Sequence, residues 1–168
     1  MKINKKMLEL LSELSKNAKK SDRDIAKILS ISQPTVTRMR KKLENKGYIS
    51  EYTTILDLTK LGFELVAFIF FKTKKIGGKK VEATAHDMIG KNPKIIFAGF
   101  GDGLSGQNCV LVCLHKDFTD YTEFLNEIKK KWRDNISDVD SFLVSLKSFT
   151  PKFLSFRDVG KLFKKSGK

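Results

Sequence analysis

Residues 21–43 read SDRDIAKILSISQPTVTRMRKKL, and this stretch carries the start signals of two helices. Ser21 followed by Asp24 is a variant of the capping box, whose side chains bond the unpaired amides at a helix start. Ser32 supplies a second cap, and Pro34 falls in the first turn of the second helix, where its missing N–H would be unpaired anyway. The pattern therefore predicts two short helices joined by a tight turn, with Ile31 filling the space between them.

The second of these helices has two unlike faces at about 100° per residue. The inward face is apolar and comprises Val36, Met39 and Leu43. The outward face is short, polar and cationic and comprises Pro34, Thr37, Arg38 and Lys41. Two capped helices, with Arg and Lys concentrated on the second, match a helix-turn-helix that reads a major groove. The alternative is a solvated basic face on a small helical domain.

The DNA-binding interpretation selects residues from the outward face, the helix start and the flanks. Predicted contacts to DNA are Ser32, Gln33, Thr35, Thr37, Arg38, Arg40, Lys41 and Lys42. Among these, Arg40 and Lys42 lie on the flanks of the helix and are expected to contact phosphates.

Charge is unevenly distributed along the 168-residue chain, whose formal net charge is +14. Residues 1–50 hold 13 Lys/Arg and 5 Asp/Glu, residues 161–168 hold four Lys and no acid, and the segment between is nearly neutral. A basic N-terminal part predicts a polyanionic partner, double-stranded DNA. A membrane surface is the competing polyanionic partner, but the sequence has no amphipathic helix that pairs a basic face with Trp or Phe on the opposite face. The longest apolar run, residues 65–71, is too short to span a bilayer. Without a cleavable signal, we expect a soluble cytoplasmic protein.

The N-terminal part extends on both sides of these helices. Residues 4–17 predict a preceding helix with one apolar stripe, and Gly47 is expected to end the recognition helix. A β-prone segment from Tyr48 to Leu56 predicts a strand leading out of the domain. The expected domains are 1–60, a helix-turn-helix domain with this linker strand, then 61–158, and a basic tail at 159–168, which is either an arm touching DNA or a solubilising end.

The second domain alternates strand and helix signals in the order β-α-β-β-α-β. Strands are expected at residues 66–72, 95–100, 108–115 and 139–149, and helices at 79–90 and 118–132. The second helix is expected to point Phe118, Tyr121, Leu125, Ile128 and Trp132 inward. This order is the ferredoxin-like motif, so the fold class is α+β. The first and third strands are apolar on both faces, and helices cover only one, which predicts a homodimer packed through the sheet.

Other chemistry-bearing residues give weak signals. Gly101, Gly103 and Gly106 match the G-x-G-x-x-G pattern of dinucleotide-binding sites. That site needs a helix after the last glycine, but a strand follows here, so a hairpin loop is predicted instead. Such a loop, at the rim of an oligomer, is a candidate effector site comprising Gly101, Asp102, Gly103, Gly106, Gln107 and Asn108. Cys109 and Cys113 lie about 13 Å apart on an extended strand, too far for one disulfide or one metal, and are expected to be buried thiols.

The chain resembles the leucine-responsive/asparagine-regulator (Lrp/AsnC) family of transcription factors, also called feast/famine regulators, of the archaeal type. The resemblance is carried by residues 7–11, 17–19, 25–27, 31–36, 38–44, 47–49, Tyr52 and 61–62. It implies a winged helix-turn-helix, a linker strand and a ferredoxin-like domain that assembles dimers and often octamers and binds an amino acid. The family's Gly-x-Tyr-Asp hairpin is replaced by residues 105–108, SGQN, which lack the Tyr and Asp of the usual pocket.

Two other functions compete with a sequence-specific regulator. An architectural protein would coat DNA with little sequence preference, using the +14 charge. Some relatives of the family decarboxylate sirohaem with histidines and arginines of the second domain, but the two histidines here, His86 and His115, form no such cluster. No carboxylate pair, nucleophile–base set or metal spacing predicts catalysis, so we expect no enzyme activity, cofactor or metal.

Overall fold

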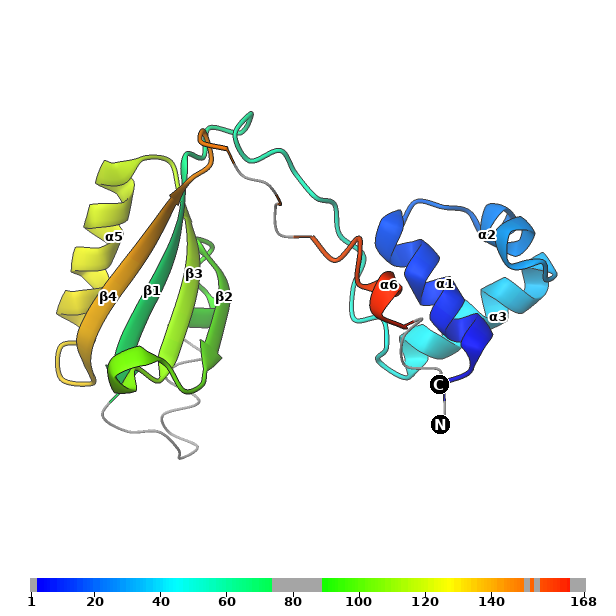
Figure 1. Cartoon of the computed structure of the whole chain (residues 1–168), viewed down its shortest axis with the longest axis horizontal. Coiled ribbons are helices and arrows are strands. Elements are labelled where there is room, and N and C mark those ends of the chain that lie inside the picture. Colours follow the sequence, from blue (N-terminus) through cyan, green and yellow to red (C-terminus); the bar gives the residue numbers. More distant parts are fainter. Residues whose placement is uncertain (1–2, 74–88, 150–151, 153–154, 164–168) are drawn as a thin grey trace. The chain divides into compact units, whose positions relative to one another are not determined.

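The computed structural model describes residues 3–73, 89–149, 152 and 155–163 (Figure 1). The chain divides into two compact units. Unit 1 comprises Met1–Leu56 together with Lys152–Lys168, and unit 2 comprises Asp57–Pro151. The sequence suggests boundaries at residues 60 and 158, whereas the structure assigns the stretch after residue 151 to unit 1 instead of to the ferredoxin-like domain.

Unit 1 is built on three helices: α1 (Lys5–Lys16), α2 (Asp22–Leu29) and α3 (Gln33–Asn45). Each begins at a cap whose side chain accepts a backbone N–H: Asn4 from Met7, Ser21 from Asp24, and Ser32 from Thr35. Between α2 and α3, Ser30 adopts a left-handed conformation with φ of 52°, which turns the chain sharply. The predicted helix-turn-helix is confirmed.

The apolar faces of these helices form one core. Its fully or almost fully buried members include Leu10 on α1, Ile25 on α2, and Val36 and Leu43 on α3, with Ile31 of the turn packed against them. The inward face predicted for α3 is therefore the observed one, which leaves the opposite face of α3 in solvent.

The segment after α3 contains no strand in this structure. Residues 49–57 are irregular, although a linker strand was expected there. A strand needs a neighbour to satisfy its backbone N–H and C=O groups, and no neighbouring strand in the described part of the chain pairs with this segment.

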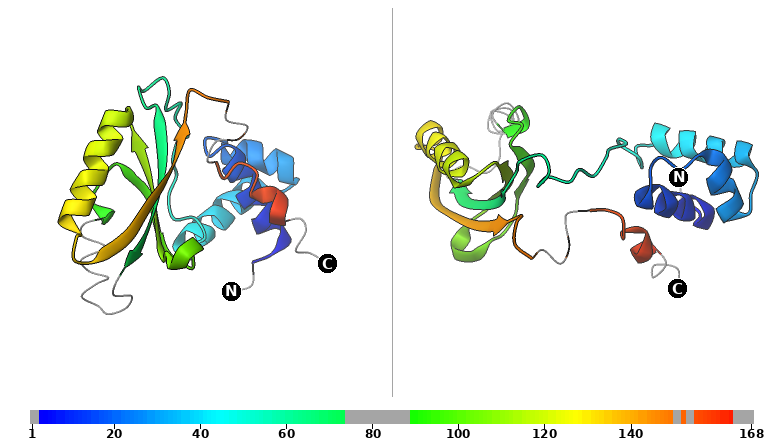
Figure 2. Two further views of the ribbon diagram at one scale, coloured as in Figure 1. Left: turned by 60° about the vertical axis from the view of Figure 1, so that its left-hand side comes forward. Right: turned by 90° about the horizontal axis from the view of Figure 1, so that it is seen from above.

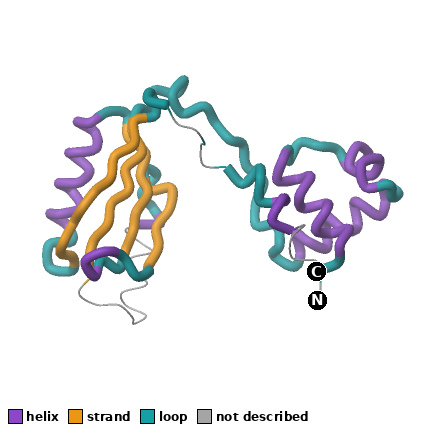
Figure 3. The backbone as a smooth tube through the Cα atoms, viewed as in Figure 1, coloured by secondary structure: helices purple, strands orange, loops and turns teal. Residues whose placement is uncertain are grey.

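Unit 2 is a four-stranded antiparallel sheet with strand order β2-β3-β1-β4 (Figure 2). The strands are β1 (Leu65–Thr73), β2 (Ile95–Phe100), β3 (Cys109–His115) and β4 (Ile136–Ser145). Helix α5 (Phe118–Lys131) lies along one face of the sheet (Figure 3), and a short 3-10 turn, η1 (Leu104–Gly106), lies between β2 and β3. The four strands of the ferredoxin-like sheet are confirmed, although β4 begins at Ile136 and ends at Ser145 instead of covering the expected 139–149. Most of the helix expected at 79–90 falls outside the described residues.

The core of unit 2 lies between the sheet and α5. Buried side chains from β1 and β3, such as Ile69, Phe71 and Leu111, meet Tyr121, Phe124 and Ile128 of α5. The inward position predicted for Phe118 is wrong, because this side chain is 62% exposed. Phe118 is the first residue after the Asp117 cap, where the helix has only just begun, and Phe124 takes a core position that the sequence prediction omitted.

A short helix, α6 (Gly160–Phe163), completes unit 1. Gly160 is buried against Ser12 of α1: a Cβ at residue 160 would lie 2.1 Å from Ser12 Oγ and 2.8 Å from Ser12 Cα. Ser12 is only 7% exposed, although it points away from the Leu10 and Leu14 side of α1. Residues 160–163, which the sequence prediction placed in a basic tail, are thus part of a packed contact.

Candidate nucleic-acid interface

The outward face of α3 is open to solvent and has free side chains. Gln33, Arg38, Lys41 and Lys42 are exposed, and their side chains make no hydrogen bond or ion pair with any residue the structure describes. Gln33, Pro34, Thr37, Arg38 and Lys41 line an open depression of about 620 Å³. The amide of Gln33 and the guanidinium of Arg38 are groups that can bond base edges, and the two lysines add charge for phosphates.

The other four predicted DNA contacts are engaged within the protein. Ser32 accepts from the Thr35 backbone N–H at 3.4 Å, and the two hydroxyls lie 2.8 Å apart, so both side chains serve the helix cap. Thr37 Oγ1 donates to Asp22 Oδ2 at 2.7 Å, and Arg40 Nε donates to Asp22 Oδ1 at 2.8 Å. The structure thus separates the predicted set into four side chains that are free, two that cap α3, and two, Thr37 and Arg40, that join α3 to α2.

Arg40 lies at the centre of a polar cluster on the flank of α3. Besides Asp22, it donates to the Tyr52 hydroxyl and the Lys20 carbonyl, each at 3.3 Å, and Tyr52 donates to Glu44 Oε1 at 2.6 Å. Burial opposes the charge of Arg40, but its bonds to Tyr52 and Asp22 outweigh that cost and raise its pKa. Burial and the Glu44 carboxylate raise the pKa of Tyr52, so its hydroxyl remains a donor.

Sequence reasoning missed this cluster. Asp22 lies 18 residues from Arg40, and Tyr52 lies 12 residues beyond it. Helical periodicity predicts which residues share a face, but it does not identify partners on another element. The one available signal was Asp22 in the first turn of α2, where an acidic residue is already explained by the helix dipole.

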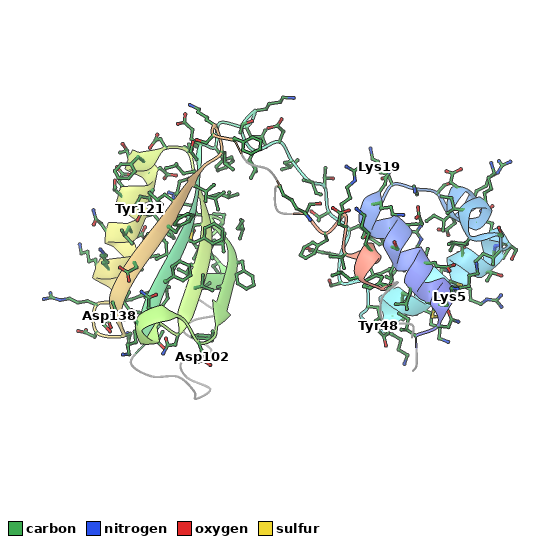
Figure 4. All side chains as sticks on the ribbon, in the orientation of Figure 1. Lys5, Lys19, Tyr48, Asp102, Tyr121 and Asp138 are labelled. Carbon is green, nitrogen blue, oxygen red and sulfur yellow. The ribbon has the colours of Figure 1, made fainter. Side chains whose placement is uncertain are left out.

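The glycine loop predicted as an effector site is a hairpin between β2 and β3, as expected (Figure 4, which labels Asp102). Its amides are largely used within the loop: Gly103 N donates to Gln107 O at 2.7 Å, and Gly101 N donates to Asn108 O at 3.1 Å. Gly106 has φ of 75°, a conformation that glycine adopts without strain.

The amide side chains of this loop bind neighbouring strands. Gln107 is 7% exposed, and its Nε2 donates to Asp138 O at 3.1 Å and to Asp140 Oδ2 at 2.5 Å. Asn108 Oδ1 accepts from Thr73 N at 2.8 Å. Of the six predicted effector residues, Gln107 and Asn108 therefore secure the loop to β4 and β1, while Gly101, Asp102, Gly103 and Gly106 remain exposed.

The buried reactive groups of unit 2 are placed for packing. Burial raises the pKa of Cys109 to about 11 and that of Cys113 to about 12, so both are neutral thiols at physiological pH, in agreement with their predicted burial. His115 has no exposed surface and stacks edge-on against Tyr121. Burial lowers the pKa of His115, and the Asp120 carboxylate, 3.4 Å from its Nδ1, only partly offsets this effect.

Neither a metal cluster nor a membrane-spanning helix occurs among the described residues. No three His, Cys, Asp or Glu side chains there lie together in a way that could hold a metal ion. No helix in the same residues is both long and apolar enough to cross a membrane.

Comparison with known proteins supports the helix-turn-helix. Residues 3–50 match the family model described as winged helix-turn-helix DNA-binding. The chain is 32% identical over 94 residues to the HTH-type transcriptional regulator FL11 of Pyrococcus horikoshii, an alignment that covers 56% of this chain and 58% of FL11. The chain spans about half to two thirds of the length of the curated relatives that it matches at 30% identity or more.

Solved structures share the whole two-unit fold. An AsnC family transcriptional regulator from Agrobacterium tumefaciens has a TM-score of 0.75 at 18% identity and covers 90% of this chain and 97% of its own. A transcriptional regulator from Neisseria meningitidis, in complex with L-Met, has a TM-score of 0.74 at 19% identity. The match covers 89% of this chain and 93% of the Neisseria chain. Residues 3–50 thus match a winged helix-turn-helix domain, the chain is homologous to HTH-type transcriptional regulators, and its fold is the two-domain fold of these solved regulators.

Proposed function

We propose that this protein is a sequence-specific regulator of transcription that binds double-stranded DNA through α3. The observation that carries the proposal is the outward face of α3, where Gln33, Arg38, Lys41 and Lys42 are exposed and unpaired within the described residues. The excess of positive charge in residues 1–50 supports the same partner. Such a role belongs in the cytoplasm and requires no catalysis.

We further propose that the protein acts as a homodimer joined through the open face of its sheet. Register places Phe97, Val112, Phe68 and Phe142 in one row across all four strands. The row lies on the face opposite α5, because the neighbours Ala67 and Ile69 of Phe68 point into the core against α5. Phe97 is 56% exposed and Phe142 64% exposed, an apolar surface that a second copy would cover. A two-fold dimer presents two recognition helices to two half-sites.

A small effector, such as an amino acid, is the third part of the proposal. The L-Met complex of the Neisseria structure and the exposed glycine loop support it. Since Gln107 and Asn108 are already bonded within the protein, the groups available to a ligand are the exposed backbone and Asp102.

The test is binding of the purified protein to the DNA upstream of its own gene and to a scrambled duplex of equal length, at about 50 to 200 mM salt. A preference of about a thousandfold or more for the upstream duplex supports a specific regulator. Equal and steeply salt-sensitive binding supports the architectural alternative, which the net charge of +14 favours. Absence of binding to both refutes the proposal.

A further inference from the structure

All three nitrogens of the Arg40 guanidinium contact the protein itself. Its side chain is 17% exposed, and Nη2 lies 2.7 Å from Asp22 Oδ1, in addition to the bond from Nε to the same oxygen. Nη2 also donates to the Lys20 carbonyl, and Nη1 donates to the Tyr52 hydroxyl. One side chain of the recognition helix therefore joins the start of α2, the turn before it and the segment that leaves the unit.

Asp22 binds α3 at two points one turn apart. Its second oxygen accepts from Thr37 Oγ1 at 2.7 Å while the first accepts from Arg40. The Asp22 side chain is 19% exposed, so loss of its cationic partner would leave a carboxylate partly withdrawn from water without compensation. The two bonds add to the buried face of Val36, Met39 and Leu43 in holding the rotation of α3 about its own axis, since a turn of the helix would break both.

Tyr52 brings the connecting segment to the same cluster. The Arg40 guanidinium carbon lies 5.8 Å from the centre of the Tyr52 ring, which is within the range of a cation–π contact. The Tyr52 hydroxyl then donates to Glu44, one turn after Arg40 on α3. Residues 49–56 are otherwise irregular. Ile49 attaches the start of this segment to α3 through its N–H, which donates to Leu43 O at 3.4 Å, and Tyr52 adds a side-chain attachment three residues further on.

We propose that Arg40 and Tyr52 are positioning residues, which set the orientation of α3 and couple it to the connecting segment, and that Arg40 does not contact phosphate. This inference rests on the proposed DNA-binding function. It replaces the expectation, drawn from helical spacing, that Arg40 is a phosphate contact equivalent to Lys42. A conformational change that displaces residues 49–56 would act on the recognition helix through Tyr52.

Salt dependence separates positioning from phosphate contact. Removing one phosphate contact reduces the slope of log K against log salt by about 0.9, whereas a loss of positioning lowers affinity by the same factor at every salt concentration. The probe is a duplex of about 30 base pairs selected by the wild-type protein from a random pool. The variants are Arg40→Gln, Arg40→Lys and Tyr52→Phe, with Lys42→Gln as the matched control, because Lys42 is the exposed phosphate contact expected on the same helix.

Lys42→Gln should flatten the slope by about 0.9. Arg40→Gln and Tyr52→Phe should each weaken binding by about 5- to 30-fold with the slope unchanged, and the double variant should be no weaker than Arg40→Gln alone. Arg40→Lys keeps the charge but loses the planar fork, so it should behave as Arg40→Gln does. A flattened slope in Arg40→Gln, with Arg40→Lys near wild type and Tyr52→Phe silent, would overturn the proposal.

Denaturant unfolding of the same variants provides a readout that does not need DNA. If wild-type protein fails to bind any duplex, the proposed function fails, but the coupling of Arg40 and Tyr52 is still measured by a double-mutant cycle. Non-additive losses of stability support the coupling. Strictly additive losses overturn it, whether or not the protein binds DNA.

Discussion

Replacing Phe142 with alanine should dissociate the proposed dimer. The side chain is 64% exposed in the single chain, and a phenylalanine buries on the order of 200 Å², so about 130 Å² remains for a second copy to cover. At about 25 cal/mol per Å², this area is worth ~3 kcal/mol per protomer and ~6 kcal/mol in a symmetric dimer, which is an upper bound. We therefore expect the dimer dissociation constant to rise, by at most about four decades.

Sedimentation equilibrium over a range of protein concentrations measures this constant directly, and it also detects assembly to octamers. The matched control is Phe118→Ala, because Phe118 is 62% exposed but lies on α5, away from the open face of the sheet. Both variants should keep the fold of unit 2, since neither side chain is part of its core. Equal dissociation constants for the two variants, or a wild-type protein that remains monomeric at micromolar concentrations, would refute the reasoning.

Three further outcomes test other parts of the structure. Gly160→Val would place its Cβ 2.1 Å from Ser12 Oγ, so it should separate α6 from α1 at a cost of about 1–3 kcal/mol in stability. Hydrogen exchange of the α1 amides should then become faster. The control is Gly101→Val, whose added Cβ has nothing within 4 Å and should leave this exchange rate unchanged. Because burial lowers the pKa of His115 in the folded protein, the unfolded state takes up a proton first as pH falls, and stability should drop below about pH 6.5. Denaturant unfolding at a series of pH values should show a smaller drop for His115→Phe. An identical pH dependence in the two proteins would contradict the lowered pKa of His115. Cys109 and Cys113, with pKa values of about 11 and about 12, should not react with a thiol reagent at pH 8 until denaturant is added; prompt labelling of the native protein would show that they are not buried thiols.

Features with local causes were predictable from the sequence. The starts of α2 and α3 follow from Ser21 and Ser32, and the inward face of α3 follows from the spacing of Val36, Met39 and Leu43. Strands β1, β2 and β3 follow from apolar runs bounded by turn residues, whereas the more polar β4 was predicted with shifted bounds. In each case the signal and its consequence lie within one turn of helix or one strand.

Features that join distant parts of the chain were not predictable in this way. The pairing of Arg40 with Asp22 and Tyr52 depends on how α2 and the connecting segment pack on α3, so periodicity placed Arg40 on an exposed flank. Gln107 was included in the candidate effector site because it belongs to the glycine-rich hairpin loop, yet it is buried against β4. The contact of Gly160 with Ser12 joins two residues that carry no local signal of pairing at all.

The docking of α6 on α1 makes unit 2 an insertion within unit 1, because residues 57–151 lie in sequence between the two parts of unit 1. During synthesis, α1, α2 and α3 emerge well before residue 160, so the three-helix core forms while the Ser12 face of α1 is still uncovered. The DNA-binding unit is therefore completed only after the sheet has been made. A nascent chain halted anywhere in unit 2 would carry the recognition helix without the helix that packs behind α1.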